Sequence, residues 1–346
     1  MAAAAFHGLA GAPLNWQGTM VYPGSTEDPW AQDVLKGHYD HHQADLLLTI
    51  MDAWVLSPEV VAGMNAAHWL PADCSPLSAL DRRILAEGRG RPIAMSEFGR
   101  RQVTGAGWEA LYAPHAIDTQ KVFVPSPSRD GVRDETGMAG RFLIGINAAN
   151  QDPARKGFAE QFEAFAEFRK GHPEALLLVN TRAVTTQGTN LTVLAASLGL
   201  GEDCVQFCDQ YLHAAGLTGQ DKMARWYGLL DLLSNCSYGE GFGLPVLEAQ
   251  ACGTPVVVTD CSAMTELCGS GFLVEGSRFW NKGHSAWWTR PSVTGIAEAY
   301  EEAFALWQGG GLAAYREKAR AFAVGYDADK VLHEYWVPVL AELCAA

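Results

Sequence analysis

The chain has 346 residues, of which 48% are hydrophobic and 18% are charged, and its formal net charge is −14 at pH 7. This length and apolar content suffice for two domains with ample cores. The acidic balance argues against a protein that coats nucleic acid and against a basic protein of the membrane surface, so nucleic acid is not an expected partner.

Neither a membrane segment nor a secretion signal is expected. No run approaches the roughly eighteen apolar residues of a membrane span, and the first residues lack the charged start and long apolar core of a signal peptide. The eight cysteines are scattered among apolar segments without a Cys-x2-Cys pair. In a chain too large to need disulfide staples, this pattern favours reduced thiols and a cytoplasmic protein.

Residues 1–128 are predicted to form the first of two α/β domains. Short apolar runs indicate strands within 18–23, 44–51, 92–96 and 111–118. Asp52 follows one of these runs, and we expect it either to face a cleft or to cap a helix. His68 and His115 are interpreted either as hydrogen-bonding partners of a ligand or as structural residues.

A linker is predicted at residues 129–140. The segment 124–137 around its start is rich in Pro, Gly, Ser and charged residues and has no apolar period. The second domain is expected over 141–325, and a C-terminal helix over 326–346 carries an apolar stripe that suits packing back on the N-terminal domain.

The second domain is predicted to be a parallel, doubly wound sheet. Its apolar runs are short and continuous, as in strands covered on both faces, and they alternate with helical patterns such as the phenylalanines of 158–168. The six expected strands lie at 142–146, 175–179, 205–207, 231–235, 255–259 and 271–274. The aromatic pairs at 279–280 and 287–288 are expected either to pack between late helices or to stack on a sugar or base.

The segment 237–259 predicts a site for an anion. A glycine-rich turn follows an apolar run, two carboxylates bracket the turn, and Pro245 suits a first helical turn. The resulting helix N-terminus presents unpaired N–H groups that favour a phosphate. Glu248 is expected in the first turn of that helix, where it could accept hydrogen bonds from a vicinal diol such as a ribose. Alternatively, the turn is an ordinary strand-to-helix connection and Glu248 only a partner of the helix dipole.

A second cluster lies at residues 147–157, directly after the first strand of the second domain. Arg155 and Lys156 stand at a loop-to-helix junction at the carboxyl end of a strand, which is where open α/β sheets bind ligands. Two cations there could neutralise a diphosphate. The other interpretation is a solvated basic pair.

The run from Glu240 to Ala249 resembles the Glu-Gly-Phe-Gly-Leu-Pro-x-x-Glu-Ala pattern of retaining glycosyltransferases with the GT-B fold, in particular glycosyltransferase family 4 (glycosyl transferases group 1). The segment 114–118 is similar to the Pro-Asn-Gly-Ile-Asp signature of the same family. The resemblance implies an α/β fold of two Rossmann-like doubly wound domains facing a cleft. By the same resemblance, the N-terminal domain is expected to lack its first βα-unit.

The resemblance also implies residue roles. It makes Asp52, His68 and His115 candidates for contacts on the acceptor side. Glu240 is expected at the donor sugar and Lys156 at the phosphates, as the catalytic pair, with Glu248 at the ribose. An arginine that usually precedes the lysine is replaced here, so either Arg155 compensates or Asn147 or Asn150 contacts the phosphate. The backbone of four further residues is expected along the sugar and diphosphate: Gly241, Phe242, Gly243 and Leu244.

The function that follows is transfer of a hexose-type sugar from a nucleotide-sugar donor to an acceptor hydroxyl with retention of configuration. The acceptor could be a glycan, a lipid or a small molecule. No cofactor and no metal are expected, because GT-B enzymes generally use cations of the protein; the histidines of 38–42 have no evident partner cluster. The alternatives are a GT-B nucleotide-sugar epimerase and a degenerate, non-catalytic nucleotide-sugar-binding protein.

Overall fold

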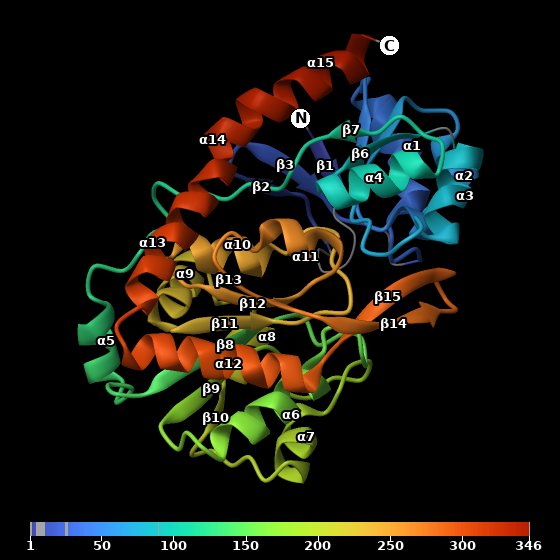
Figure 1. The fold of residues 1–346 in the computed structure, drawn as a ribbon. Coiled ribbons are helices and arrows are strands. Elements are labelled where there is room, and N and C mark those ends of the chain that lie inside the picture. The colour runs from blue at the N-terminus through green and yellow to red at the C-terminus, as the bar shows by residue number, and fades with distance from the viewer. Residues whose placement is uncertain (1, 5–10, 25–26, 89, 346) are drawn as a thin grey trace. The chain divides into compact units, whose positions relative to one another are not determined.

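The structure, a computed structural model, describes residues 2–4, 11–24, 27–88 and 90–345 (Figure 1). The chain divides into two compact units. Unit 1 comprises Met1–Ala113, Asn281–Ala286 and Glu334–Ala346, and unit 2 comprises Pro114–Trp280 and Trp287–His333. All eight cysteines are free thiols. Across the described ranges, each helix is too short or too polar to pass through a lipid bilayer.

Unit 1 contains a four-stranded parallel sheet in the order β4-β5-β6-β7. Its strands are β4 (Leu47–Ile50), β5 (Ala66–Leu70), β6 (Arg91–Ala94) and β7 (Leu111–Tyr112). A second, three-stranded sheet has the order β1-β3-β2, with β1 (Ala2–Ala4), β2 (Leu14–Trp16) and β3 (Thr19–Tyr22). The helices of the unit before β7 are α1 (Gln32–His41), η1 (Ala53–Val55), α2 (Pro58–Val61), α3 (Ala79–Gly88) and α4 (Glu97–Gly105).

The expected strands of unit 1 are present, but β1, β2 and β5 were absent from the sequence prediction. All five residues of β5 are buried, and they pair with both β4 and β6. The stretch from Ala66 to Leu70 contains two alanines and a histidine, so it lacks the β-branched character that marks a central strand. The pairing with β4 and β6, which are distant in the sequence, makes this stretch a central strand.

The last helices of unit 1 are η3, a π-helical segment (Leu332–Trp336) that begins in unit 2, and α15 (Val337–Ala345). Leu343 of α15 is fully buried. The ring of Trp336 meets that of Trp69 edge to face, with 4.7 Å between centroids. The Asn65 amide donates to the Leu343 carbonyl at 3.0 Å, and Arg91 pairs with Glu342. The C-terminal helix is therefore anchored on the parallel sheet of unit 1.

Unit 2 is built on a six-stranded, all-parallel sheet in the order β10-β9-β8-β11-β12-β13. All six predicted strands are confirmed: β8 (Phe142–Asn147), β9 (Ala175–Asn180), β10 (Val205–Phe207), β11 (Leu232–Asn235), β12 (Val256–Thr259) and β13 (Gly271–Val274). The helices before β12 are α5 (Arg129–Glu135), α6 (Phe158–Arg169), α7 (Leu191–Ser197), α8 (Gln210–Ala214), α9 (Gln220–Leu229) and α10 (Leu244–Ala251). Those after β12 are α11 (Ser262–Leu267), α12 (Val293–Gln308), α13 (Leu312–Ala323), η2 (Val324–Tyr326) and α14 (Ala328–Val331).

Helices cover both faces of this sheet (Figure 1). Phe142, Ile144 and Ile146 of β8 share one core with α6 and α12. The predicted phenylalanine stripe of α6 forms the centre of that core, with at most 3% of any of its four side chains exposed. On the other face, a Cβ on Gly145 would meet Leu230 at 2.3 Å. The missing side chain at Gly145 therefore lets the end of α9 approach the strand closely.

Two segments differ in local structure from what the sequence predicts. The linker expected at 129–140 contains helix α5, and the buried Arg133 of that helix bonds to the body of the unit. The aromatic pairs do not pack between late helices but lie on a hairpin, β14 (Gly276–Asn281) and β15 (Ala286–Pro291), and their stacking on a sugar or base stays a prediction. Apolar periodicity missed both, because α5 is held by charge and because the hairpin exposes one face.

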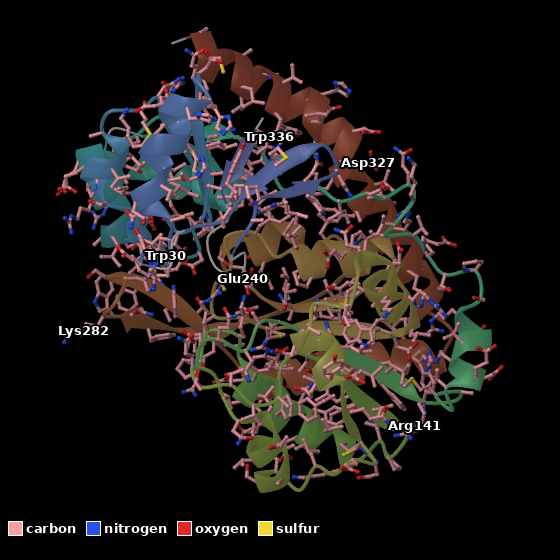
Figure 2. All side chains as sticks on the ribbon, turned by 180° about the vertical axis from the view of Figure 1, so that it is seen from behind. Trp30, Arg141, Glu240, Lys282, Asp327 and Trp336 are labelled. Atoms are coloured by element: carbon pink, nitrogen blue, oxygen red, sulfur yellow. The ribbon has the colours of Figure 1, made fainter. Side chains whose placement is uncertain are left out.

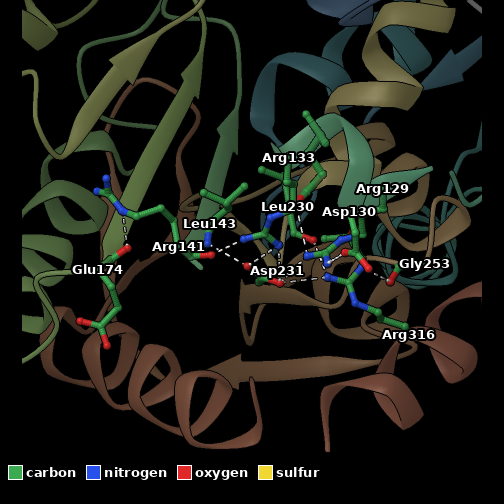
Figure 3. A network of polar contacts seen from close by, with 12 residues as sticks. Arg129, Asp130, Arg133, Arg141, Leu143, Glu174, Leu230, Asp231, Gly253 and Arg316 are labelled. Atoms are coloured by element: carbon green, nitrogen blue, oxygen red, sulfur yellow. Dashed lines mark hydrogen bonds and ion pairs between the residues drawn. The ribbon is translucent and has the colours of Figure 1, made fainter. Parts of the chain in front are cut away.

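A buried carboxylate fastens α5 and α13 to the amino ends of β8 and β11 (Figure 3). Asp231 is 1% exposed and is paired with three arginines. Arg133 Nη1 lies 3.1 Å from Oδ2 and Arg316 Nη2 lies 3.3 Å from Oδ1, while Arg129 Nη2 also donates to Oδ1. The Leu143 amide donates to Oδ2 at 2.9 Å. Both carboxylate oxygens are thus fully engaged within the fold.

Candidate active site

The candidate site of unit 2 lies at the opposite, carboxyl ends of β8 and β11. The loop that leaves β11 carries Glu240, labelled in Figure 2, and runs directly into α10. The loop that leaves β8 carries Arg155 and Lys156 and runs into α6. Because β8 and β11 are neighbours in a parallel sheet, their loops meet at the same edge.

Backbone geometry prepares the start of α10. Gly243 caps the helix with φ of 119°, which only glycine adopts readily, and Pro245 follows in the first turn. No side chain caps this end. Among the residues that the structure describes, none accepts a hydrogen bond from the amides of Gly241 to Leu244. These amides are available to an anion, as the sequence predicts for a helix N-terminus.

Glu240 sits between two cations. Lys156 Nζ donates to Oε1 at 2.6 Å, and Arg155 Nη1 donates to Oε2 at 3.2 Å. The side chains of Glu240 and Lys156 are 12% and 13% exposed, and that of Arg155 is 29% exposed. Burial pushes the pKa of Glu240 up, but the charges of Lys156 and Arg155 outweigh burial and lower it to about 2. Glu240 is therefore a carboxylate at any physiological pH.

The position of Lys156 is set by its neighbour. A Cβ on Gly157, whose φ is +59°, would lie 2.2 Å from the carbonyl oxygen of Cys236. Only glycine permits this approach of the α6 N-terminus to the end of β11. The Gln161 amide holds the Lys156 carbonyl at 2.9 Å, and the Tyr238 amide donates to the Arg155 carbonyl at 2.8 Å. The two loops are thereby joined through their backbones.

Sequence reasoning missed one further support of Glu240. The backbone amide of Glu240 donates to Ser262 Oγ at 3.0 Å, and the amide of Ala263 approaches the Glu240 carbonyl at 3.4 Å. Ser262 begins α11 with φ of 53°, an unusual value for a serine. The only sequence signal is a run of small polar residues after β12, which does not identify a partner.

Glu248 occupies a different environment. Because α10 begins at Leu244, Glu248 lies in the second helical turn, not in the first as predicted. Tyr227, a fully buried residue of α9 that sequence reasoning also missed, donates to Glu248 Oε2 at 2.7 Å. Burial raises the pKa of Glu248, and the hydrogen bond from Tyr227 opposes this shift.

The predicted asparagines take two separate positions. Asn147 Nδ2 donates to the Tyr227 hydroxyl at 2.6 Å, which places Asn147 beside Glu248. The amide of Asn150, a residue only 2% exposed, bonds to Arg182 and Thr189 of the following loop. Asn150 therefore fastens that loop, whereas Asn147 stays near the predicted donor site.

The segment with the predicted family signature reaches the glycine-rich loop. The ring of His115 lies 5.2 Å from that of Phe242, and Tyr326 contacts Phe242 from another side at 5.9 Å. Burial lowers the pKa of His115 to about 4, so its imidazole is neutral near pH 7. His115 thus supports the donor loop within unit 2.

The other two acceptor-side candidates, Asp52 and His68, lie in unit 1. Asp52 is exposed and directly precedes η1, but its side chain makes no capping hydrogen bond. His68 is fully buried in β5, where Nδ1 shares a 2.8 Å hydrogen bond with Thr49 Oγ1 and burial lowers its pKa to about 4. This position fits the structural interpretation of His68.

No cluster of three or more His, Cys, Asp or Glu side chains suitable for a metal ion occurs in the described part of the chain. His38 and His42 lie close to each other on and after α1, with ring centroids 6.1 Å apart. The charged groups that pair with one another at the candidate site are those of Glu240, Lys156 and Arg155.

Residues 144–282 match the family model described as glycosyl transferases group 1. The resemblance to this family is confirmed. A D-inositol 3-phosphate glycosyltransferase of Mycolicibacterium vanbaalenii is 25% identical over 283 residues, 73% of this chain and 58% of that protein. Its counterpart in Corynebacterium jeikeium is 33% identical over 173 residues, 47% of this chain and 39% of that protein. The chain spans about half the length of the curated relatives that it matches.

Solved structures agree with the predicted fold class. Sucrose-phosphate synthase from Thermosynechococcus elongatus aligns with a TM-score of 0.77 at 15% identity, over 100% of this chain and 89% of that one. An Anabaena protein solved in complex with UDP and glucose aligns with a TM-score of 0.69 at 18% identity, over 94% and 87%. The fold is that of the GT-B glycosyltransferases, with a parallel α/β sheet in each unit.

Proposed function

We propose that the protein transfers a hexose-type sugar from a nucleotide-sugar donor to an acceptor hydroxyl, with retention of configuration. The observation that carries this proposal is the cluster of Lys156, Arg155 and Glu240 beside the unbonded amides of the glycine-rich loop. Departure of a nucleoside diphosphate develops negative charge on the phosphates, so a site for this reaction needs fixed positive charge and N–H donors there.

Lys156 and Arg155 are proposed to bind the phosphates of the donor. Lys156 Nζ has three hydrogens and gives one to Glu240, so it can also donate to a phosphate oxygen. Arg155 gives the same site a second cation from the adjacent position. The amides from Gly241 to Leu244 add neutral donors at a helix N-terminus. Asn147 is retained as a predicted contact of the donor.

Glu240 and Glu248 are proposed to contact different parts of the donor. Glu240, ionised and oriented by Lys156, would lie at the sugar and stabilise the positive character that develops at its anomeric carbon. Glu248 would accept from the ribose hydroxyls. The solved Anabaena relatives that bind UDP or UDP-glucose support a uridine nucleotide as the first donor to test.

The acceptor is proposed only as a class. A glycan, a lipid or a small molecule can supply the hydroxyl, and the names of the relatives add inositol phosphates to the candidates. The free thiols are consistent with a cytoplasmic location, which belongs to the same proposal.

The test is a panel of UDP-, GDP- and ADP-sugars, read first by thermal shift and then by release of nucleoside diphosphate with and without candidate acceptors. We expect one donor to raise the melting temperature and to be turned over, with the anomeric configuration of the product retained by NMR. Interconversion of the donor sugar without transfer would instead show an epimerase. Binding without transfer or hydrolysis would show a non-catalytic binding protein.

A further inference from the structure

Four buried or half-buried polar side chains form a continuous chain of hydrogen bonds that ends at Glu248. Asn180 Nδ2 donates to Asn147 Oδ1 at 2.9 Å, and Asn147 Nδ2 donates to the Tyr227 hydroxyl at 2.6 Å. The hydroxyl then donates to Glu248 Oε2 at 2.7 Å. Asn147 and Asn180 are register partners at the carboxyl ends of β8 and β9, so the sheet itself fixes the start of the chain.

The direction of these hydrogen bonds is determined by Glu248, which is the last acceptor of the series. An ionised carboxylate can only accept, so the single proton of the Tyr227 hydroxyl must point to Glu248. The hydroxyl oxygen is then free to accept, and Asn147 presents its amide N–H to it. Asn147 in turn presents its oxygen to Asn180. Every donor therefore points toward Glu248, with no conflict along the chain.

This arrangement uses Oε2 of Glu248 as a hydrogen-bond acceptor and leaves Oε1 available to accept another hydrogen bond. Within the described residues, Tyr227 is the only group that donates to the Glu248 side chain. The carboxylate cannot rotate without breaking a short bond to a residue that is itself 0% exposed. Oε1 is thus held in one direction as an acceptor for a hydroxyl donor.

We propose that Tyr227, with Asn147 and Asn180 behind it, is a positioning residue that makes Glu248 select a nucleotide with ribose hydroxyls. This inference rests on the proposed function, because it assumes that a nucleotide binds beside Glu248. It adds a source of the selectivity: the carboxylate discriminates because a fixed donor, anchored on the sheet, orients it. A freely rotating glutamate would lose entropy on binding and would discriminate less.

The experiment deletes the hydroxyl on the protein and the hydroxyls on the ligand together. Affinities of UDP, ADP and GDP are measured by calorimetry, and the tightest of them is compared with its 2′,3′-dideoxy analogue. We expect the wild type to prefer the ribonucleotide by about tenfold or more, as for hydrogen bonds to a charged group. In Tyr227→Phe this preference is expected to fall at least about fivefold, while dideoxy affinity is nearly unchanged.

Tyr300→Phe is the matched control. Tyr300 is also 0% exposed in unit 2, and its hydroxyl donates to Ser234 Oγ at 2.7 Å, away from Glu248. We expect this variant to keep the wild-type ratio of ribonucleotide to dideoxynucleotide affinity. If Tyr227→Phe weakens both ligands equally, or leaves both unchanged, the positioning role is contradicted. If no nucleoside diphosphate binds the wild type, the proposed function fails first and the inference with it.

A second variant and a pH series test the positioning role even if Tyr227→Phe is unstable. Asn147→Ala leaves the Tyr227 hydroxyl in place but removes its support, so a smaller loss of the preference for the ribonucleotide is expected. If Asn147 contacted a phosphate instead, the substitution would lower the affinities for the ribonucleotide and for the dideoxynucleotide equally. Because the Tyr227 hydrogen bond opposes the upward pKa shift of Glu248, its removal should move the acid loss of affinity to higher pH. An unchanged pH profile would indicate a merely structural tyrosine.

Discussion

Two carboxylates of unit 2 are each surrounded by more than one cation, at opposite ends of the same sheet. Asp231, at the amino ends of the strands, faces three arginines, and Glu240, at the carboxyl ends, faces Lys156 and Arg155. Local charge counting would treat these clusters alike. Their surroundings differ, and the difference separates a cluster whose donors are used within the fold from one that keeps donors for a ligand.

The arginines around Asp231 use their remaining N–H groups on the protein. Arg316 donates to the carbonyls of Gly253 and Leu230 at 3.2 and 2.6 Å, and Arg129 donates to the carbonyl of Leu229 at 3.3 Å. Burial, with Arg129 nearby, lowers the pKa of Arg316 to about 10. Such a cluster has little capacity left for a ligand, and its effect is to fasten α5 and α13 to the sheet.

The Glu240 cluster lies beside backbone amides that make no hydrogen bond within the described chain. Arg155 also donates to the Gly239 carbonyl at 3.2 Å, whereas Lys156 Nζ gives one of its three hydrogens to Glu240 and keeps two that a ligand can use. This cluster therefore has capacity for an anion that the Asp231 cluster lacks. An excess of positive charge marks a binding site only where the cations retain donors that a ligand can reach.

The largest expected effect is on stability. Asp231→Ala leaves three arginines without their carboxylate and should lower the free energy of unfolding by about 3–5 kcal/mol. Denaturant unfolding of the wild type, of this variant and of a control variant measures the change in the free energy of unfolding. The control is Asp203→Ala, because Asp203 is 75% exposed where it pairs with Arg169, and it should cost at most about 1 kcal/mol. Equal effects of the two substitutions would refute the distinction drawn for Asp231.

The next prediction contrasts the two glutamates of the site. Glu240 has a lowered pKa, so its charge stabilises the fold at neutral pH and this contribution is lost as pH falls from about 4.5 toward 2. Glu248 has a raised pKa, so its ionisation opposes folding as pH rises. At pH 7, Glu240→Gln should destabilise by about 2 kcal/mol, while Glu248→Gln should be neutral or slightly stabilising. Thermal melts from pH 3 to 8 measure both, and shifts of the same sign would contradict the opposite environments.

A smaller effect is expected on nucleotide binding. Glu248→Ala should weaken the affinity for the donor nucleotide by more than about 1 kcal/mol, because it removes a half-buried acceptor of ribose hydroxyls. Calorimetry with the nucleoside diphosphate measures this change. Unchanged affinity would remove the ribose assignment and leave the Glu240 cluster as the whole of the site.

The smallest expected effect is that of metal removal. Lys156 and Arg155 are proposed to supply the positive charge that a divalent ion provides in other transferases. Turnover of the preferred donor should therefore be the same with EDTA as with added Mg²⁺. A loss of activity in EDTA that Mg²⁺ restores would show that these cations are insufficient.

The sequence predicted the sheet of unit 2 well because its signal is local. Strands buried on both faces appear as short apolar runs, and the phenylalanines of α6 recur at helical spacing. The candidate residues Glu240, Lys156 and Arg155 were identified from short motifs, and the parallel pairing of β8 with β11 brings them together.

The remaining features depend on contacts between distant segments. Tyr227 contacts Glu248 across 21 residues, and Asn180 contacts Asn147 across 33. Helix α5 has no apolar stripe and is held by Arg133 on Asp231, 98 residues away. Strand β5 is defined by its two neighbours, not by its composition. Local periodicity carries no information about such partners.

The most direct test of the proposed donor site is release of nucleoside diphosphate from the preferred nucleotide sugar by Lys156→Met. Lys170→Met is the matched control, because Lys170 lies just beyond the other end of α6 and pairs with an exposed glutamate. We expect Lys156→Met to lower kcat by about a hundredfold or more, as for loss of a preorganised charge at a leaving group, and Lys170→Met to leave it unchanged. Wild-type turnover in a folded Lys156→Met variant would contradict the proposal that the Glu240 cluster is the donor site.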